Sequence, residues 1–226
     1  MGVQSVSLWR LSLEANIVRE QPLFWKIVGT LERLMACALL IVALPVLVFA
    51  AITVMILSRR SPLITHRRVG HGGRDIWVLK LRTMWPSAKR ACRFSPFIEP
   101  VSSEPAADVK SELDPRVTSR FAAFCRRHSI DEYPQLWQVI RGEMTLVGPR
   151  PLTAEEIETY YGDKAIEFLS VKPGLTGLWQ VRGRSRLKHA QRTRLDLFMI
   201  RRWSLPLYLM ILAATVPSVL TGKDAW

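Results

Sequence analysis

An uncharged apolar run near the N-terminus constrains this chain more than any other feature. The 24 residues from Leu34 to Leu57, LMACALLIVALPVLVFAAITVMIL, contain no charged side chain. As a helix the run is about 36 Å long, enough to cross the hydrocarbon core of a bilayer. A buried core helix of a soluble domain is the alternative, but so long an uncharged stretch is rare there. The run also starts too late for a secretory signal peptide. We therefore expect a membrane helix.

Positive charges flank this run on both sides, and a proline lies near its middle. Lys and Arg mark the cytoplasmic end of a membrane helix, so two positive ends favour a helix that enters and leaves on the same face. Pro45 removes one helical hydrogen bond and favours a kink. We expect a re-entrant, proline-kinked helix over residues 25–58. A straight single span with its N-terminus outside is the alternative. The flanking cations are Arg10, Arg19, Lys26, Arg33, Arg59, Arg60, Arg67 and Arg68.

Net charge and aromatic content indicate a membrane surface. The formal net charge is +13, the pI is near 10.4, and eight residues are tryptophan. A strongly basic chain favours a polyanionic partner, and the tryptophans favour anionic membrane lipids over nucleic acid. We expect no nucleic-acid binding, because the high pI is the single feature of the sequence that favours it. The scattered Cys37, Cys92 and Cys125 have no metal-binding spacing and indicate a reducing compartment.

Turn and helix signals divide the chain into three parts. We expect an N-terminal interfacial segment at 1–24, with a frayed tail as the alternative, the membrane helix at 25–58, and a cytoplasmic domain at 59–226. These elements predict an α-rich α+β fold. The proline-rich stretch 95–117 predicts a mobile surface loop and candidate lid. Further expected elements are a hairpin around the turn 70–73, helices at 118–128, 132–141, 154–169 and 187–202, a turn at 172–177, and an interfacial C-terminal helix at 205–220.

Two adjacent carboxylates, Asp131 and Glu132, lie in the run RRHSIDEYPQLW. Ser129 and Glu132 also fit the capping box S-x-x-E, so a helix cap is the simpler explanation. With Ser129 as N-cap, however, Pro134 would fall past the first helical turn, where proline is costly. A start at Ile130 or Asp131 places both acids at the helix N-terminus, about 100° apart around its axis. One carboxylate could then attack a phosphorus while the other binds a metal.

Several cationic side chains could bind phosphate groups. Lys80 and Arg82 share one face of an extended segment and could reach one diphosphate, although a solvated strand edge is the more ordinary explanation. Arg150 lies between two prolines that restrict its backbone, which suits a bidentate phosphate contact or a structural turn equally. Asp196 lies in a basic segment, where an ion pair with Arg192 one helical turn earlier is the default.

Five motifs, in their order along the chain, resemble the bacterial sugar transferase family. These are the monotopic phosphoglycosyl transferases that begin exopolysaccharide, capsule and O-antigen synthesis. The resemblance covers about residues 30–226. It implies an α-rich monotopic membrane protein with a catalytic domain at 59–226 and a re-entrant helix broken near a proline, in agreement with the flanking charges. The motifs are HRRVG at 66–70, KLRTM at 80–84, DPRVT at 114–118, SIDEYPQLWQVIRGEMTLVGPRP at 129–151 and PGLTGLWQV at 173–181.

The resemblance also implies an activity and assigns residues to it. Members transfer a sugar-1-phosphate from a UDP-sugar to undecaprenyl phosphate and release UMP, at the cytoplasmic face of the bacterial inner membrane. By resemblance Asp131 is the nucleophile that forms a phosphosugar-aspartyl intermediate, and Glu132 is a ligand of Mg²⁺. The residues that match polar positions of the family motifs, and are therefore expected to bind substrate, are Lys80, Arg82, Arg126, Arg150 and Asp196.

The chain departs from the family pattern at two notable positions. An aspartate that many members carry near the start of the membrane helix is replaced by Ala36, and His66 stands where many have glutamine. A catalytically inactive basic scaffold of a polysaccharide assembly is the alternative from another class, although a scaffold needs no adjacent carboxylates. The branch resemblance suggests galactose or glucose as the sugar, and the sequence leaves a homodimer open.

Overall fold

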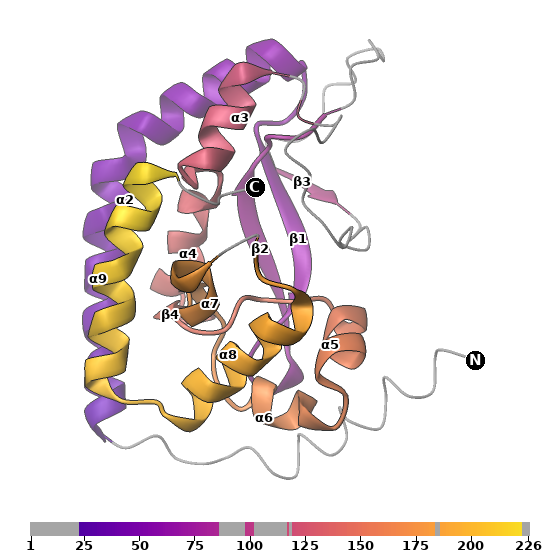
Figure 1. Ribbon diagram of the computed structural model, residues 1–226. Helices are drawn as coiled ribbons and strands as arrows, with labels where there is room; N and C mark the ends of the chain where they lie inside the picture. Colours follow the sequence, from indigo (N-terminus) through magenta and orange to yellow (C-terminus); the bar gives the residue numbers. More distant parts are fainter. Residues whose placement is uncertain (1–22, 86–97, 102–116, 118, 184–185, 223–226) are drawn as a thin grey trace.

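The computed structural model describes residues 23–85, 98–101, 117, 119–183 and 186–222, and its elements are mostly helical (Figure 1). Helix α2 spans Leu23–Ser58 and continues through Pro45 as one helix whose course is curved (Figure 1). Among the described residues it is the helix that, by length and composition alone, could cross a membrane. The long apolar helix expected from the sequence is thus confirmed, and its re-entrant path stays a prediction. The predicted interfacial segment 1–24 lies almost entirely outside the described residues.

One narrow stripe of α2 faces the rest of the protein, and the remainder of its apolar surface is exposed. Between Glu32 and Ala50 the buried and half-buried residues recur every three or four positions, along about 27 Å of helix. Large exposed apolar side chains lie on either side of this stripe, as expected for a helix that contacts lipid. The stripe passes the proline without interruption and is made of Glu32, Ala36, Leu40, Ala43, Leu47 and Ala50.

Glu32 anchors α2 to two other elements. Its Oε1 atom accepts a hydrogen bond from the backbone N–H of Leu146 at 2.9 Å and another from the hydroxyl of Tyr208 at 2.7 Å. Leu146 belongs to strand β4 (Thr145–Val147) and Tyr208 to helix α9 (Leu205–Thr221). Glu32 lies one helical turn before Ala36, on the same stripe, so it supplies a carboxylate near the position where the family's usual aspartate is missing.

Removing the Glu32 carboxylate should destabilise the protein. Glu32→Leu leaves the Leu146 N–H and the Tyr208 hydroxyl without their acceptor, a loss of about 3 kcal/mol. We expect Tm in detergent micelles to fall by roughly 10 °C. Glu32→Gln keeps an acceptor oxygen and should lose clearly less. An unchanged Tm for Glu32→Leu would show that these two hydrogen bonds do not hold helix α2 in place.

A three-stranded sheet in the order β2-β1-β3 lies on the opposite side of the molecule from α9 (Figure 1). Strands β1 (Leu63–Val69) and β2 (Asp75–Leu81) form the expected antiparallel hairpin, connected through the short 3₁₀ turn His71–Gly73. Strand β3 (Ile98–Val101) pairs with β1 in parallel, so this part of the predicted surface loop 95–117 is a strand. Most of that loop lies outside the described residues.

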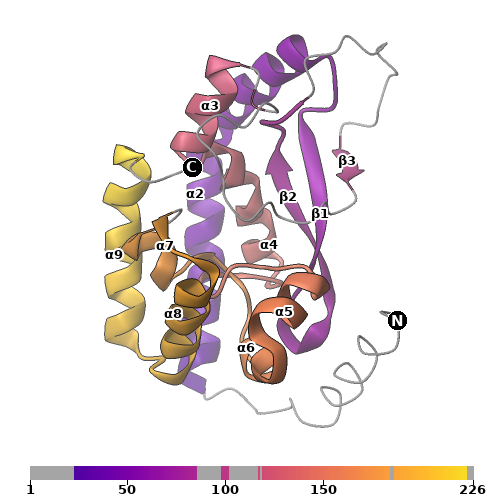
Figure 2. The same cartoon turned by 45° about the vertical axis from the view of Figure 1, so that its right-hand side comes forward.

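The remaining elements form a helical layer against the hairpin (Figure 2). The predicted helix 154–169 is interrupted at Gly162, whose φ of 48° suits glycine. The predicted turn 172–177 contains a strand instead, because residues 174–176 pair in parallel with β4. The C-terminal helix was expected at 205–220 and is confirmed as α9. The further elements are α3 (Arg120–Arg127), η2 (Ile130–Gln135), α4 (Leu136–Ile140), α5 (Ala154–Tyr161), η3 (Gly162–Lys164), α6 (Ala165–Leu169), β5 (Gly174–Thr176), α7 (Leu178–Arg182) and α8 (His189–Arg201).

The folded domain contacts both ends of α2. Near its start, the ring centroids of Trp25 and Trp203 lie 5.7 Å apart, and in its second half those of Phe49 and Phe121 lie 6.2 Å apart. Figures 1 and 2 agree that α3 lies beside the end of α2, whereas the connection from α8 to α9 lies near its start. Both halves of the apolar helix therefore pack on one body.

Candidate active site

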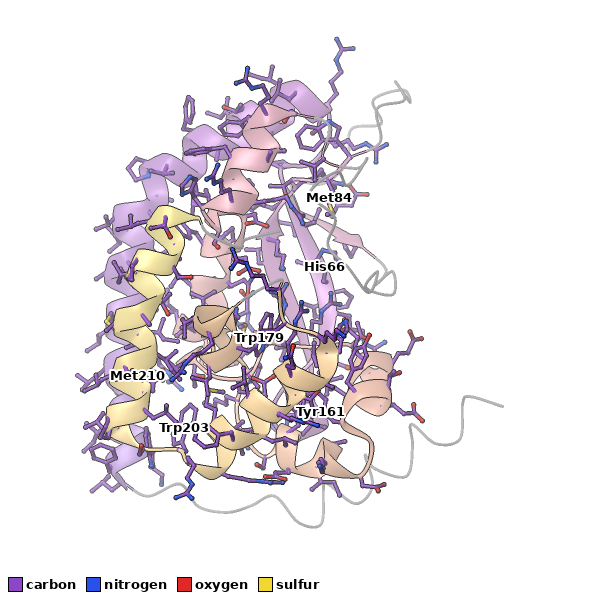
Figure 3. The ribbon with its side chains drawn as sticks, viewed as in Figure 1. His66, Met84, Tyr161, Trp179, Trp203 and Met210 are labelled. Carbon is purple, nitrogen blue, oxygen red and sulfur yellow. The ribbon has the colours of Figure 1, made fainter. Side chains whose placement is uncertain are left out.

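The β1–β2 hairpin presents one polar face to the interior of the site. In the antiparallel register His66 is paired with Val78, and Ile64 with Lys80. Because alternate residues of a strand share a face, His66 and Arg68 of β1 lie on the same face as Val78 and Lys80 of β2. All four line one pocket. Figure 3 shows His66 on the strands, above Trp179 of the helical layer.

The two acidic residues lie at the start of a 3₁₀ helix, η2, that packs against β2. Ser129 adopts a left-handed conformation with φ 56°, and the helix begins at Ile130, one of the two expected starts. The Ser129 side chain makes no capping hydrogen bond; its carbonyl accepts from the Glu132 N–H at 3.0 Å instead. The capping box suggested by the sequence therefore does not form. Asp131 and Glu132 occupy the first turn, ahead of Pro134.

Glu132 forms ion pairs with two cations that are far from each other in the sequence. Its Oε1 atom lies 3.3 Å from Nζ of Lys80 and 3.4 Å from Nη1 of Arg150. Burial lowers the pKa of Lys80, and the charges of Glu132 and Asp131 oppose that shift. The structure thus brings Lys80, Glu132 and Arg150, three of the residues expected from the sequence, into one pocket. Asp131 is adjacent to Glu132 in η2 and its charge acts on Lys80, but it is not part of the pocket lining, so its role as nucleophile stays a prediction.

A close approach of two glycines positions Arg150. Strands β4 and β5 pair in parallel, and the Gly148 N–H donates to the Thr176 carbonyl at 2.8 Å just beyond β4. A Cβ atom on Gly148 would lie 2.6 Å from the backbone nitrogen of Gly174, closer than side chains tolerate. This contact fixes Gly148-Pro149-Arg150 against the start of the PGLTG motif, so Arg150 projects into the pocket beside Gln180.

Two of the expected substrate-binding arginines, Arg82 and Arg126, are not part of the pocket lining. Arg82 donates from Nε to the Ser61 carbonyl at 2.7 Å and from Nη2 to Glu99 at 2.5 Å, and it is almost fully buried. This arrangement connects β2 to β3 and is not part of the pocket lining. Arg126 lies in the last turn of α3. Its backbone carbonyl accepts a hydrogen bond at 3.1 Å from the N–H of Ser129, the residue before η2. Substrate binding by Arg82 and Arg126 stays a prediction.

Asp196 lies in a buried polar network. Tyr161 donates to its Oδ2 atom at 2.8 Å, and the Arg192 guanidinium stacks 4.9 Å from the Trp179 ring centroid. Burial raises the pKa of Asp196 to about 7, against hydrogen bonds from Tyr161 and Trp179 and the charge of Arg192. Asp196 is absent from the pocket lining, so its substrate-binding role also stays a prediction.

The raised pKa of Asp196 should make stability depend on pH. The folded state holds this proton more tightly than the unfolded chain, so Asp196 stabilises the fold most below about pH 4. The unfolding free energy should fall as pH rises to about 7, by about 4 kcal/mol. Asp196→Asn should largely remove this slope, because an amide does not titrate in this pH range, and its oxygen can still accept the hydrogen bond from Tyr161. Chemical denaturation between pH 5 and 8 measures the effect, and equal slopes for both proteins would contradict it.

A model of the bacterial sugar transferase family matches residues 25–222. This chain belongs to that family. The family membership predicted from the five motifs is therefore confirmed, and the match includes both the apolar helix and the domain packed on it.

Curated proteins of similar sequence are sugar transferases of bacterial surface polysaccharides. The UDP-galactose-lipid carrier transferase of Erwinia amylovora is 38% identical over 219 residues, which cover 96% of this chain and 44% of that protein. The exopolysaccharide production protein ExoY of Sinorhizobium fredii is 41% identical over 168 residues, 71% of either chain. The UDP-glucose:undecaprenyl-phosphate glucose-1-phosphate transferase of Caulobacter vibrioides is 39% identical over 192 residues, 80% of this chain and 65% of that protein. The chain thus spans under half the length of the Erwinia relative.

Sequence reasoning missed several residues of this sugar transferase's pocket. His66 and Arg68 lie within the HRRVG motif, where their two-residue spacing on a strand was a usable signal. Gln135 follows the acidic pair within the same 3₁₀ helix, and Gln180 lies in the LWQV part of the last motif. Gln135 and Gln180 could not be recognised as pocket residues by residue type or spacing, because a single glutamine has no distinguishing sequence pattern.

Proposed function

We propose that this sugar transferase moves a sugar-1-phosphate from a UDP-sugar to undecaprenyl phosphate and releases UMP, as the first membrane step of exopolysaccharide synthesis. The observation that carries the proposal is Glu132 held between Lys80 and Arg150 in a pocket beside Asp131. A carboxylate nucleophile next to phosphate-binding cations is the arrangement that two-step phosphoryl transfer needs. The names of the relatives from Erwinia and Caulobacter support a UDP-sugar donor and a lipid carrier acceptor.

In the first step the Asp131 carboxylate attacks the β-phosphorus of the UDP-sugar. The bond from that phosphorus to the bridging oxygen breaks, UMP leaves with the electron pair, and a phosphosugar-aspartyl ester forms. In the second step a phosphate oxygen of undecaprenyl phosphate attacks the same phosphorus and frees the Asp131 carboxylate. Lys80 and Arg150 stabilise the charge on the phosphate oxygens in both steps. Cys125 is no rival nucleophile, because burial and the charge of Asp131 raise the pKa of its thiol to about 12.

The residues present fit a magnesium ion whose ligands come partly from the protein and partly from the phosphates of the substrate. Magnesium is commonly bound by one or two carboxylates together with substrate phosphates, and Asp131 and Glu132 are adjacent carboxylates in one helical turn. Within the described ranges no group of three or more His, Cys, Asp and Glu side chains gathers, so phosphate oxygens would complete the shell. Glu132 would hold the ion, which when bound would neutralise phosphate charge as a Lewis acid.

The location of the acidic pair suits an acceptor that arrives within a membrane. Ile130, the residue before Asp131, packs in one cluster with Ala50 and Val54 of α2. We therefore place the site at the cytoplasmic face of the inner membrane, with α2 re-entrant. A straight span would carry one half of α2 away from the domain, whereas its narrow stripe contacts that domain on both sides of Pro45. These contacts support a monotopic arrangement and anionic lipids as its surroundings.

The test is UMP release by the purified membrane-bound protein with undecaprenyl phosphate and a panel of UDP-sugars. We expect release with UDP-galactose or UDP-glucose, loss of release on EDTA treatment, and recovery with added Mg²⁺. The matched control omits undecaprenyl phosphate, which should reduce release to about one turnover per protein if the first step forms a covalent intermediate. Absence of release with every UDP-sugar would favour the inactive scaffold.

A further inference from the structure

Three polar atoms around the pocket have no hydrogen-bond partner among the described residues. They are Nδ1 of His66, Nε2 of Gln135 and Oε1 of Gln180. Each atom is buried, and each comes from a different element: strand β1, the 3₁₀ helix η2 and helix α7. Buried polar atoms in native proteins are nearly always paired, so three such atoms around one pocket call for a ligand that pairs with them.

The three side chains are uncharged, in contrast to the cations beside them. Glutamine carries no charge, and burial together with the charges of Lys80, Arg68, Arg150 and Arg82 lowers the pKa of His66 to about 4. The imidazole is therefore neutral at neutral pH. The orientation of the Gln180 amide is fixed, because its Nε2 atom donates to the Leu175 carbonyl at 3.3 Å. Its unpaired Oε1 atom is thus an acceptor.

The chemistry of these atoms selects a hydroxyl-bearing ligand. A phosphate oxygen only accepts hydrogen bonds and cannot pair with the Gln180 carbonyl oxygen. A sugar hydroxyl both donates and accepts, so it can pair with an amide oxygen, an amide N–H and either form of a neutral imidazole. The cations of the pocket can bind the phosphate, and the neutral side chains can bind hydroxyl groups of the sugar that is bonded to that phosphate.

We propose that His66, Gln135 and Gln180 form a subsite that binds the hydroxyl groups of the transferred hexose and determines which UDP-hexose is used. This inference rests on the proposed function. The hexose is favoured over the ribose because it is bonded to the β-phosphate, which must lie beside Glu132 in the same pocket. The ribose is separated from that phosphorus by the α-phosphate.

The experiment measures kcat/KM for UDP-galactose and for UDP-glucose and takes their ratio, because a ratio does not depend on the amount of folded enzyme. For Gln180→Leu and His66→Ala we expect about a tenfold loss of kcat/KM with the preferred epimer, the effect of one neutral hydrogen bond. The other epimer should lose less, so the ratio should change at least threefold. His66→Gln restores an acceptor and a donor and should keep the wild-type ratio within about twofold.

Two matched variants serve as controls. Gln138 is also a buried glutamine with an unpaired oxygen, but it lies outside the pocket and donates to the Trp77 carbonyl at 3.0 Å. Gln138→Leu should leave the epimer ratio unchanged. Arg67, on the outer face of β1 and paired with Asp75, controls for His66, and Arg67→Gln should also keep the ratio.

Inhibition by UMP, which contains the ribose and no hexose, separates the two sugars of the donor. An unchanged inhibition constant together with an altered epimer ratio supports the hexose. A matching loss of UMP binding in Gln180→Leu and His66→Ala would assign the subsite to the uridine part of the donor, its ribose or its base, and overturn the inference. An unchanged epimer ratio in both variants would overturn it as well. Failure of the wild-type protein to use any UDP-hexose would instead refute the proposed function itself.

Discussion

Asp131→Asn is expected to lower sugar-1-phosphate transfer by more than a thousandfold, because the amide cannot attack the β-phosphorus and no covalent intermediate can form. Asparagine has nearly the same shape, and the adjacent Ile130 keeps its packing against α2. The variant should therefore still insert into membranes. Radiolabelled UDP-sugar should label the wild-type protein in the absence of acceptor and leave the variant unlabelled.

Asp163→Asn is the matched control for this prediction. Asp163 is exposed in the first turn of the 3₁₀ helix Gly162–Lys164, far along the chain from the acidic pair. The same chemical change there should keep wild-type transfer. Substantial transfer by Asp131→Asn, with the label still bound to protein, would remove Asp131 from the role of nucleophile and point to another residue.

Glu132→Gln is expected to lower transfer by about a hundredfold or more. Glu132 holds Lys80 and Arg150 within 3.3 Å and 3.4 Å of one oxygen, and the neutral amide leaves the two cations to repel each other. Displacements of about 1 Å in a phosphate-binding group can cost on this scale. The variant should also need more Mg²⁺ for half-maximal rate if Glu132 is the metal ligand.

The pH profile of Glu132→Gln tests the electrostatic part of this argument. Burial already lowers the pKa of Lys80, and Glu132 opposes that shift. Loss of the carboxylate should lower the pKa of Lys80 further, so the fall in activity at high pH should begin at a lower pH than in the wild type. Glu143→Gln breaks the exposed 2.8 Å ion pair with Arg141 and is the control that should change neither rate nor profile. Activity of Glu132→Gln within threefold of wild type would contradict both parts.

Local sequence features gave most of the elements, and their failures have local causes. The hairpin, the C-terminal helix and the start of η2 follow from turn residues, apolar runs and Pro134, which act over a few positions. The capping box at Ser129 failed because this residue takes a left-handed conformation in a tight link between α3 and η2. Local sequence predicts a turn where strand β5 lies, because its three residues are specified by pairing with β4, about thirty residues earlier in the chain.

Several residues of the candidate site could be predicted from the sequence, but which of them lie close together in the fold could not. Lys80, Glu132 and Arg150 meet only because a hairpin, a 3₁₀ helix and a glycine–glycine contact place them there. Arg82 has the same residue type as Arg150 and lies two positions from Lys80, yet it bonds Ser61 and Glu99. Sequence spacing cannot distinguish these two arginines, because the partner of each comes from another part of the chain.

By itself the sequence determined that this protein has a long apolar helix and belongs among the sugar transferases, since an uncharged run and long motifs need no tertiary contacts to be recognised. It could not determine which side of α2 meets the domain. A helix that is apolar all round has no polar face to mark the direction of water, so its hydrophobic pattern leaves its orientation undefined. The tertiary structure decided it through Glu32 and the small residues Ala36 and Ala50, where backbone groups and side chains of the domain come close enough to bond and pack.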